Sequence, residues 1–548
     1  MEEKLRLDTN PGNKDFTNAA VVIIGAGISG MCMAIDLIKR NKCHNFVILE
    51  KSSGVGGTWR DNNILYSYSF EQSTKWSRQF PGQEELLAYL THVAEKYGLH
   101  KYVRFNSEVT EARWSEEEKK WKVSTKVSGD KDNQFTRSYV LSTDFLISAV
   151  GQLNFPREPD IPGLKEFRGK MMHSARWDWT YNYENKRIAI IGNGATAAQI
   201  VPEVAKVASH LTVYQRNPNW VIPRSDTAIS PLEQALLTYL PPLRIRKRSL
   251  AMDFRESFHE VIRDSQSQTA RLARNITAQR LRTQLANKPE LWDKLTPNYA
   301  PGCKRLIITD DYYPALGREN VDLETRRILR ITETGIAVEG DSQQEYDLII
   351  LATGFKTVEF MCPIEIHGSK NRPLTEIWKD GASAYYGVTV EDLPNFGMFY
   401  GPNTNLGHSS VILMIEAQSR YLNALVARVL QARTQGKTLV IKPNVRALRK
   451  YNIELQKASW YKTENGKITN NWSGTVIDYQ RSLSQVRWAD YEVEGTAKDA
   501  VRPGEVTNLG HVHEETYISN RSLALTIAGM LAVAGGVFLR WTSLVRAC

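Results

Sequence analysis

Residues 21–30, VVIIGAGISG, and residues 187–197, RIAIIGNGATA, decide the fold. Each stretch begins with a run of apolar, mostly β-branched residues, turns at a Gly-x-Gly, and continues with apolar residues at helical spacing. This order of strand, tight turn and helix opens a dinucleotide-binding unit. The first glycine allows the bend, the second lets a pyrophosphate approach, and the third small residue lets helix and strand pack closely. The sequence therefore predicts two such units in one chain.

The residues that follow the two loops differ in charge. Glu50 lies 25 residues after Gly25, behind a predicted strand at 46–49, and Arg216 lies 24 residues after Gly192, behind a predicted strand at 211–214. A carboxylate at this place accepts hydrogen bonds from both ribose hydroxyls, whereas a guanidinium pairs with a 2′-phosphate. The first loop therefore suits FAD or NAD and the second suits NADPH. The predicted loop contacts are Gly25, Gly27 and Gly30 in the first site, and Gly192, Gly194 and Ala197 in the second.

The rest of the chain fits one unit inserted in the other. A third apolar strand is predicted at 348–351, and residues 230–300 have helical periodicity and many charges. The expected fold class is α/β, with two Rossmann-like dinucleotide-binding domains and the NADPH domain inserted in the FAD domain. The predicted boundaries are a flexible tail at 1–18, the FAD domain at 19–175 and 345–520, the NADPH domain with a helical insertion at 176–344, and a membrane anchor at 522–541.

Composition excludes several classes of protein. The chain has 548 residues, 42% hydrophobic and 24% charged, which is typical of a globular enzyme with more than one domain. Its net charge of +10 comes from Lys and Arg spread along the chain, without the clusters of a nucleic-acid-binding protein, so no nucleic-acid partner is expected. The five cysteines have neither disulfide-framework nor metal-ligand spacing, which favours a reducing compartment. The sequence does not define an oligomeric state.

The C-terminal end is unlike the rest. Residues 522–539 are uncharged and largely apolar, with Arg521 before them and Arg540 after them. Eighteen residues at about 1.5 Å each nearly cross a hydrocarbon core of about 30 Å. A buried helix is the alternative, but an apolar helix after the last domain has little left to pack against. The expectation is a single-pass C-terminal membrane anchor with the catalytic domains in the cytosol.

Between the two loops, the chain resembles the class B flavoprotein monooxygenases, and within them the Baeyer–Villiger monooxygenases. Phe167, Gly169, His173 and Trp177 match the spacing of the family fingerprint FxGxxxHxxxW. The resemblance implies that this segment links the two domains and couples their motion. His173 is then a structural or conformational residue rather than one that transfers a proton.

Further matches extend the resemblance over most of residues 18–480. Gly57, Thr58 and Trp59 resemble the family's FAD-contacting segment, and the stretch from Asp347 to the Ala-Thr-Gly at 352–354 resembles its second FAD signature. Residues 401–408 resemble the loop that reaches the isoalloxazine, which makes Asn403 a cofactor contact. By the same resemblance, Lys304 holds the NADP 2′-phosphate and Arg305 is the catalytic arginine.

The family's chemistry accounts for these residue types. The resemblance implies that NADPH reduces FAD, and that O2 then supplies one oxygen atom to a ketone, which becomes an ester or lactone. Negative charge develops on the substrate, and an arginine stays charged at neutral pH to stabilise it. The expected substrate is a hydrophobic ketone, because of the predicted membrane anchor.

One departure from the family follows Trp59. The family continues through a Tyr-Pro-Gly segment that carries an Asp facing the catalytic arginine, whereas here residues 60–64 pass directly into the Leu-Tyr-Ser-Tyr run at 65–68. The role of that Asp is not transferred to Asp61. Two alternatives therefore stay open beside the Baeyer–Villiger enzyme: an N- or S-oxygenating flavin monooxygenase, and a membrane-tethered flavoprotein with reduced or no catalysis.

Overall fold

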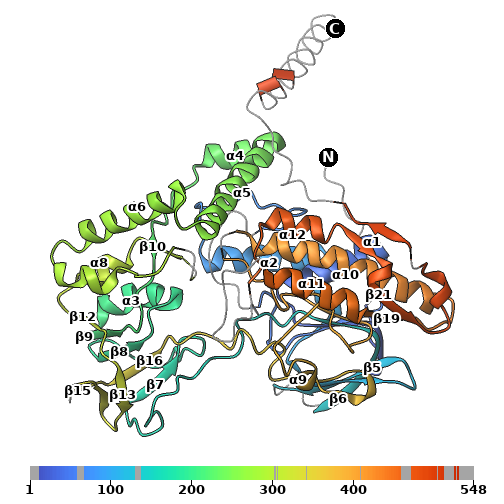
Figure 1. Ribbon diagram of the computed structural model, residues 1–548, viewed down its shortest axis with the longest axis horizontal. Coiled ribbons are helices and arrows are strands. Elements are labelled where there is room, and N and C mark those ends of the chain that lie inside the picture. Colours follow the sequence, from blue (N-terminus) through green and yellow to red (C-terminus); the bar gives the residue numbers. More distant parts are fainter. Residues whose placement is uncertain are drawn as a thin grey trace, which may run out of the picture.

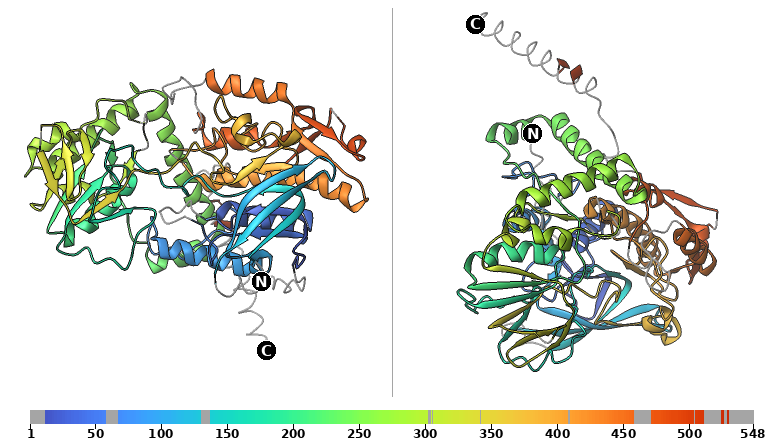
Figure 2. Two further views of the ribbon diagram at one scale, coloured as in Figure 1. Left: turned by 90° about the horizontal axis from the view of Figure 1, so that it is seen from below. Right: turned by 60° about the vertical axis from the view of Figure 1, so that its left-hand side comes forward.

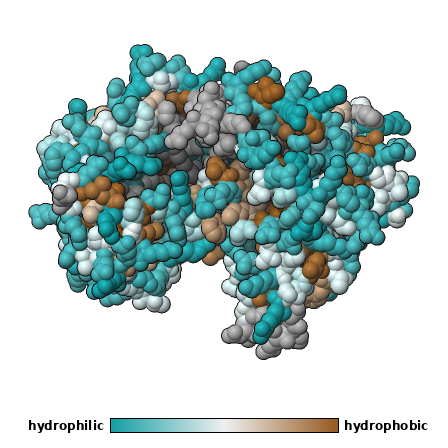
Figure 3. Space-filling view, turned by 60° about the horizontal axis from the view of Figure 1, so that its bottom comes forward, coloured by the Kyte–Doolittle hydropathy of each residue, from teal (hydrophilic) through white to brown (hydrophobic). Residues whose placement is uncertain are grey.

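The computed structural model of the chain describes residues 12–57, 67–129, 137–301, 304, 306–340, 342–407, 409–457, 471–502 and 504–510, and the pairs 524–525 and 528–529. Two lobes, each built on a β-sheet, lie side by side in Figure 1. The helices α4 (Pro231–Tyr239), α5 (Pro241–Arg263) and α6 (Gln268–Gln284) run across the top of that view, with α5 at the junction of the lobes. The surface that comes forward in Figure 3 is hollowed between the lobes.

An eight-stranded sheet forms the first lobe. Its order is β17-β4-β5-β6-β1-β2-β3, and β18 also pairs with β6. β1 is buried at every residue but its first and pairs in parallel with β2 and β6, which explains its unbroken apolar run. The strands are β1 (Asn18–Ile24), β2 (Phe46–Leu49), β3 (Val103–Arg104), β4 (Ser107–Ser115), β5 (Lys120–Val127), β6 (Ser138–Ser148), β17 (Glu365–His367) and β18 (Phe396–Met398).

Both faces of this sheet are covered. Val21 and Ile23 of β1 join a core formed with helices packed on one face, while Val22 and Ile24 join a second core on the other face. This alternation is the two-residue period of a strand. The helices of the first lobe are α1 (Ile28–Asn41), α2 (Gln83–Lys96), α9 (Leu374–Ile377), α10 (Val411–Thr434), α11 (Val445–Lys457) and α12 (Val476–Ser482).

A five-stranded parallel sheet forms the second lobe, in the order β12-β9-β8-β16-β7. One face packs with α3 (Ala195–Val207) and α8 (Tyr312–Leu316), and the other with an antiparallel three-stranded sheet. Figure 2 shows this lobe turned forward in its right-hand view. The strands are β7 (Lys170–His173), β8 (Arg187–Ile191), β9 (His210–Tyr214), β12 (Val321–Glu324) and β16 (Leu348–Leu351), with β13 (Ile328–Ile331), β14 (Gly335–Val338) and β15 (Ser342–Glu345) forming the smaller sheet.

Short elements complete the fold. A two-stranded sheet of β10 and β11 frames the helical insertion, and two antiparallel pairs lie near the end of the first lobe. They are β10 (Val221–Ile222), β11 (Ile307–Ile308), β19 (Val440–Pro443) with β21 (Tyr491–Glu494), and β20 (Gln485–Arg487) with β22 (Val506–Asn508); α7 (Trp292–Leu295) closes the insertion.

The strand limits predicted at 46–49 and 348–351 coincide with β2 and β16, and the apolar run that opens the stretch 187–197 forms β8. The placement of β16 differs from expectation, because residues from 345 onward were assigned to the FAD domain, whereas β16 lies between β8 and β7 in the second sheet. β7, which precedes the predicted boundary at 175, belongs to that sheet as well. An apolar strand indicates that both of its faces are buried, but its sequence does not show which sheet it belongs to.

The membrane anchor predicted at 522–541 is contradicted. No helix among the described residues is long and apolar enough to cross a bilayer, and only four residues of that span are among them. The fold class is therefore corrected to an α/β architecture in which the described residues include no membrane-spanning helix, and the predicted single-pass membrane localisation is not supported. An apolar run indicates that its side chains are shielded from water. It does not show whether a bilayer, another part of the protein or a partner shields them.

Candidate dinucleotide-binding sites

The first glycine loop joins β1 to α1 and leaves no room for a side chain at Gly25 or Gly30. Gly25 has φ +104°, and a Cβ there would lie 2.7 Å from the carbonyl oxygen of Ala149. A Cβ on Gly30 would lie 1.9 Å from the carbonyl oxygen of Gly25, so helix and turn are in direct backbone contact. Gly57, with φ +62°, approaches from another segment, and a Cβ on it would lie 3.1 Å from the Cα of Gly27. The loop therefore presents bare backbone where a pyrophosphate is expected.

Glu50 follows β2 and is held beside this loop. It is 6% exposed, and its Oε2 accepts a 2.7 Å hydrogen bond from the Ala26 amide while its Oε1 accepts a 2.8 Å bond from the Ser52 amide. Each carboxylate oxygen can accept a second hydrogen bond. The donors fix the carboxylate next to the loop and leave it capacity for ribose hydroxyls, so the residues fit an adenine dinucleotide without a 2′-phosphate.

The helices that follow both loops begin without a side-chain cap. α1 starts behind Gly27 and α3 behind Gly194, and neither N-cap glycine can supply a side-chain acceptor. By contrast, Ser230 caps α4, Ser267 caps α6 and Thr475 caps α12 through their side chains. The amides of a helix's first turn have no partner within the helix and carry its positive dipole end. At α1 and α3 these donors remain for an anion.

The second glycine loop combines a steric requirement with open space. Gly192 has φ +114°, and a Cβ there would lie 2.5 Å from the carbonyl oxygen of Ala352. Around Gly194, a Cβ would meet no atom of the described residues within 4 Å. Ala197 is fully buried where α3 packs on the sheet. The middle of this loop is therefore free for a ligand to approach.

Asn193 ties the second loop to the segment that carries Arg216. Its Nδ2 donates to the side-chain oxygen of Gln215 and to the carbonyl oxygen of Asn217, each at 2.8 Å. Arg216 lies between these two anchored residues and is exposed. Asn193 is a site residue that was not predicted from the sequence, where its amide at the middle position of the Gly-x-Gly was the available signal. The result is an accessible guanidinium beside the second loop.

Lys304 reaches the same segment from the other end of the helical insertion. It is exposed, and its Nζ lies 4.9 Å from the centroid of the Tyr299 ring, a cation–π distance. The Tyr299 hydroxyl donates a 2.7 Å hydrogen bond to the carbonyl oxygen of Pro218, two residues after Arg216. Two cations predicted to bind a 2′-phosphate thus belong to one connected stretch of surface.

The fingerprint segment forms the edge of the second sheet. His173 ends β7 opposite Leu351, and the Ala175 amide donates to its Nδ1 at 3.1 Å. Burial lowers the pKa of His173, so the ring is neutral at pH 7. A Cβ on Gly169 would lie 2.5 Å from the Phe167 ring, which explains the glycine. A neutral imidazole that accepts a backbone hydrogen bond fits the structural role predicted for His173.

Of the remaining predicted site residues, one lies among the described residues and three do not. Asn403 is 2% exposed and has φ +61°, in a loop whose Thr404 hydroxyl donates 2.8 Å to the carbonyl oxygen of Gly401. Its tight backbone fits a loop that approaches a ligand. Thr58, Trp59 and Arg305 lie outside the described residues, as does the segment 58–66 that departs from the family pattern.

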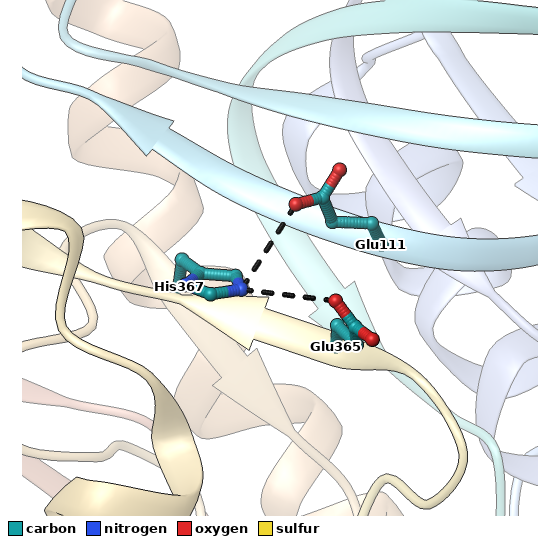
Figure 4. A group of neighbouring side chains, drawn as sticks. All are labelled: Glu111, Glu365 and His367. Atoms are coloured by element: carbon teal, nitrogen blue, oxygen red, sulfur yellow. Dashed lines mark ion pairs between the residues drawn. The ribbon is translucent and has the colours of Figure 1, made fainter.

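One group of side chains has the residue types of a metal site. Glu111 of β4 and Glu365 and His367 of β17 converge in Figure 4, with His367 Nε2 3.9 Å from Glu111 Oε1 and 4.0 Å from Glu365 Oε2. Arg113 already forms an ion pair with Glu111. A guanidinium in this position competes with a metal ion for the carboxylate, so we interpret the group as a network of surface ion pairs.

The model of the flavin-binding monooxygenase-like family matches residues 18–366, more than half of the chain. The chain belongs to this family. It is 53% identical to the FAD-binding monooxygenase ktnD of Aspergillus niger, over 97% of this chain and 90% of that protein. It is 37% identical to a Baeyer–Villiger monooxygenase of Streptomyces coelicolor, over 86% of this chain and 92% of that protein.

The fold agrees with the family. The structure of OTEMO in complex with FAD and NADP has a TM-score of 0.73 and 25% identity, covering 87% of this chain and 99% of that one. The resemblance to the Baeyer–Villiger type is therefore confirmed, and this member of the flavin-binding monooxygenase-like family is an FAD- and NADPH-dependent monooxygenase.

Proposed function

We propose that this monooxygenase inserts one oxygen atom beside the carbonyl of a ketone. The reaction balances as ketone, O2, NADPH and a proton giving an ester or lactone, NADP+ and water. The observation that carries the proposal is the pairing of the complete fingerprint, which spans β7 and its flanks, with two loops of opposite ribose charge, Glu50 buried at the first and Arg216 exposed at the second. The identity to a Baeyer–Villiger monooxygenase of Streptomyces coelicolor supports it.

Different residues of the chain bind the two cofactors. Glu50 and the uncapped amides of α1 hold the FAD adenosine and pyrophosphate, and the amides of α3 hold those of NADPH. Arg216 and Lys304 pair with the 2′-phosphate that distinguishes NADPH from NADH. Bound FAD supplies the redox chemistry that activates O2. The proposed FAD contacts are Gly25, Gly27, Gly30, Glu50, Gly57, Thr58, Trp59 and Asn403, and the proposed NADPH contacts are Gly192, Gly194, Ala197, Arg216 and Lys304.

Arg305 is the proposed catalytic residue. It follows Lys304 in the segment that matches the family's active-site stretch and precedes β11. As the reaction proceeds, the carbonyl oxygen of the ketone gains negative charge, and a permanently charged guanidinium stabilises it. Arg305→Ala is expected to keep bound flavin and NADPH oxidation but to lose ester formation, with the consumed oxygen recovered as hydrogen peroxide.

The decisive experiment is a ketone panel with NADPH and ¹⁸O2 on the purified protein, with products identified by mass. An ester or lactone carrying one labelled oxygen supports the proposal. A thioether is included in parallel, since oxidation of sulfur without any ester would identify an S-oxygenating enzyme instead. Full ester formation by Arg305→Ala would remove that residue from the mechanism. The panel spans polar and apolar ketones, because the case for a hydrophobic substrate rested on the membrane anchor and falls with it.

A further inference from the structure

One stripe of α5 faces the first lobe. Arg248, Met252, Glu256 and His259 are spaced by four, four and three residues, which places them on one side of a helix. Each has a contact outside the insertion. The contacts run from Arg248 to Ser67, from Met252 to Ser409, from Glu256 to the Val476 amide, and from His259 to the carbonyl oxygen of Ser473.

At its other end, α5 leads to the second lobe. The chain passes from α5 into α6, and Arg280 of α6 forms a 2.6 Å ion pair with Asp310. Asp310 Oδ1 also accepts a hydrogen bond from the Arg224 amide, just after β10. The insertion therefore connects the lobe that carries Arg216 to the lobe that carries Glu50, and α5 lies at the junction in Figure 1.

Arg248 contacts the residue that precedes Tyr68, which is itself bonded to the start of α1. The residue is 3% exposed, and its Nη1 donates to the Ser67 hydroxyl at 2.9 Å while its Nη2 donates to the Ser67 carbonyl oxygen at 3.3 Å. A buried guanidinium is costly unless its donors are engaged, so the two hydrogen bonds to Ser67 help to hold Arg248 in this place. Packing alone therefore does not explain an arginine here.

The tripeptide that Arg248 contacts is fixed on its other sides. The Tyr68 hydroxyl donates to the carbonyl oxygen of Ile28, the first residue of α1, at 2.6 Å. The amide and hydroxyl of Ser69 both donate to the Glu416 carboxylate, at 2.6 and 2.5 Å. Residues 67–69 thus form a stiff link from α5 to the helix that begins at the first glycine loop.

We propose that Arg248 is a positioning residue that sets the NADPH-bearing lobe relative to the flavin through the link formed by Ser67, Tyr68 and Ser69. The inference rests on the proposed assignment of FAD to the first loop and NADPH to the second. Hydride transfer needs the two rings in a narrow range of positions, and a shift of about 1 Å can cost a large factor in rate. A change at Arg248 leaves both cofactor-binding loops intact. The rate of flavin reduction should therefore fall while the affinities for FAD and NADPH stay the same.

The lobes have a second connection, which keeps the test interpretable. Gln79 and Ile229 donate backbone hydrogen bonds to Thr227 and Ser77, at 2.9 and 2.8 Å, so this contact survives a side-chain change on α5. Arg248→Met is therefore expected to fold. Arg263→Met is the matched control, because it makes the same change at an exposed residue of the same helix.

The experiment follows anaerobic flavin reduction by NADPH in the FAD-loaded protein by stopped flow, together with the melting temperature and the FAD dissociation constant. For Arg248→Met we expect the limiting reduction rate to fall by roughly tenfold. The dissociation constants of NADPH and FAD and the melting temperature are expected to stay near those of the parent. Arg248→Lys, which keeps one donor for Ser67, is expected to recover part of the rate, and Arg263→Met all of it.

Two results would overturn the proposal. One is a limiting rate for Arg248→Met equal to that of the parent, and the other is a rate loss shared by Arg263→Met. If Arg248→Met does not fold, Ser67→Ala takes its place, and an unchanged limiting rate there also overturns the proposal. Since reduction requires no ketone, absence of ester from every variant refutes the proposed function separately, whereas a parent flavin that NADPH does not reduce refutes both.

Discussion

Glu256, on the same stripe of α5, links the pH of the solution to the stability of the protein. Its Oε2 accepts a 3.1 Å hydrogen bond from the Val476 amide, at the first turn of α12. Burial, helped by the nearby charge of Asp478, raises the pKa of this carboxyl from 4.5 to about 7 in spite of the opposing hydrogen bonds from Ser409, the Val476 amide and Thr475. The variant Glu256→Gln removes the ionisation and keeps a side-chain oxygen for the amide.

The magnitude follows from the two pKa values. Below pH 4.5 the carboxyl is protonated in both the folded and the unfolded chain, and its full contribution to stability is present. As the pH rises toward 7, the unfolded chain releases the proton while the folded chain keeps it, so the free energy of unfolding falls. Above pH 7 the loss is complete, and at about 1.4 kcal/mol per pKa unit it amounts to about 3 kcal/mol at most.

The assay compares the melting temperatures of parent and Glu256→Gln, both loaded with FAD, across pH 5 to 8.5. The variant is expected to gain on the parent as the pH rises, by about 2 °C at pH 8 relative to pH 5, because the unfolding entropy of a chain of 548 residues is large. Asp253→Asn on the exposed side of α5 is the control, since its carboxyl is in water in both states. A constant difference between Glu256→Gln and the parent at every pH would show that Glu256 is not a buried acid of raised pKa.

Three further predictions concern the loops. Gly194→Ala, which meets no described atom within 4 Å, should leave the melting temperature unchanged and raise the KM for NADPH at least tenfold, whereas Gly192→Ala, at φ +114°, should lower the melting temperature itself. Arg216→Ala should raise the KM for NADPH about tenfold and leave the KM for NADH unchanged, since it removes one charge-assisted contact; equal changes for both would refute its role. Gly30→Ala should yield protein without flavin absorbance, while Gly54→Ala, which has open space, should bind flavin normally.

Local patterns explain the part of the fold that the sequence predicts. The limits of β2, β8 and β16 and the turns at Gly25 and Gly192 follow from apolar runs and glycine positions within a few residues. The contrast between Glu50 and Arg216 is equally local, because each residue lies one strand beyond its own loop. Such features are set by neighbours in the chain, and a single sequence carries them.

The features that the sequence did not predict depend on distant partners. β16 has the same apolar character as β1, β7 has no unbroken apolar run, and only the assembled sheet shows that both extend the second lobe. Arg248 stands in a helix with many charged residues, and nothing local distinguishes it from the exposed Arg263. The burial of one and the exposure of the other follow from the position of α5 between two lobes, which no spacing rule encodes. The prediction of a membrane anchor is wrong for the same reason, since an apolar run does not show what covers it.

The two sites also differ in how tightly the protein encloses them, and this difference suits a redox cycle. Glu50 is buried and Gly57 folds against Gly27, so the first site surrounds its ligand with backbone. Arg216 is exposed and the space at Gly194 is open, so the second site meets its ligand at the surface. An exposed ion pair is weak and screened by salt, whereas hydrogen bonds to a buried carboxylate are not. A cofactor that stays bound through many turnovers suits the first site and a reductant that exchanges suits the second, which agrees with the assignment proposed from the charges of Glu50 and Arg216.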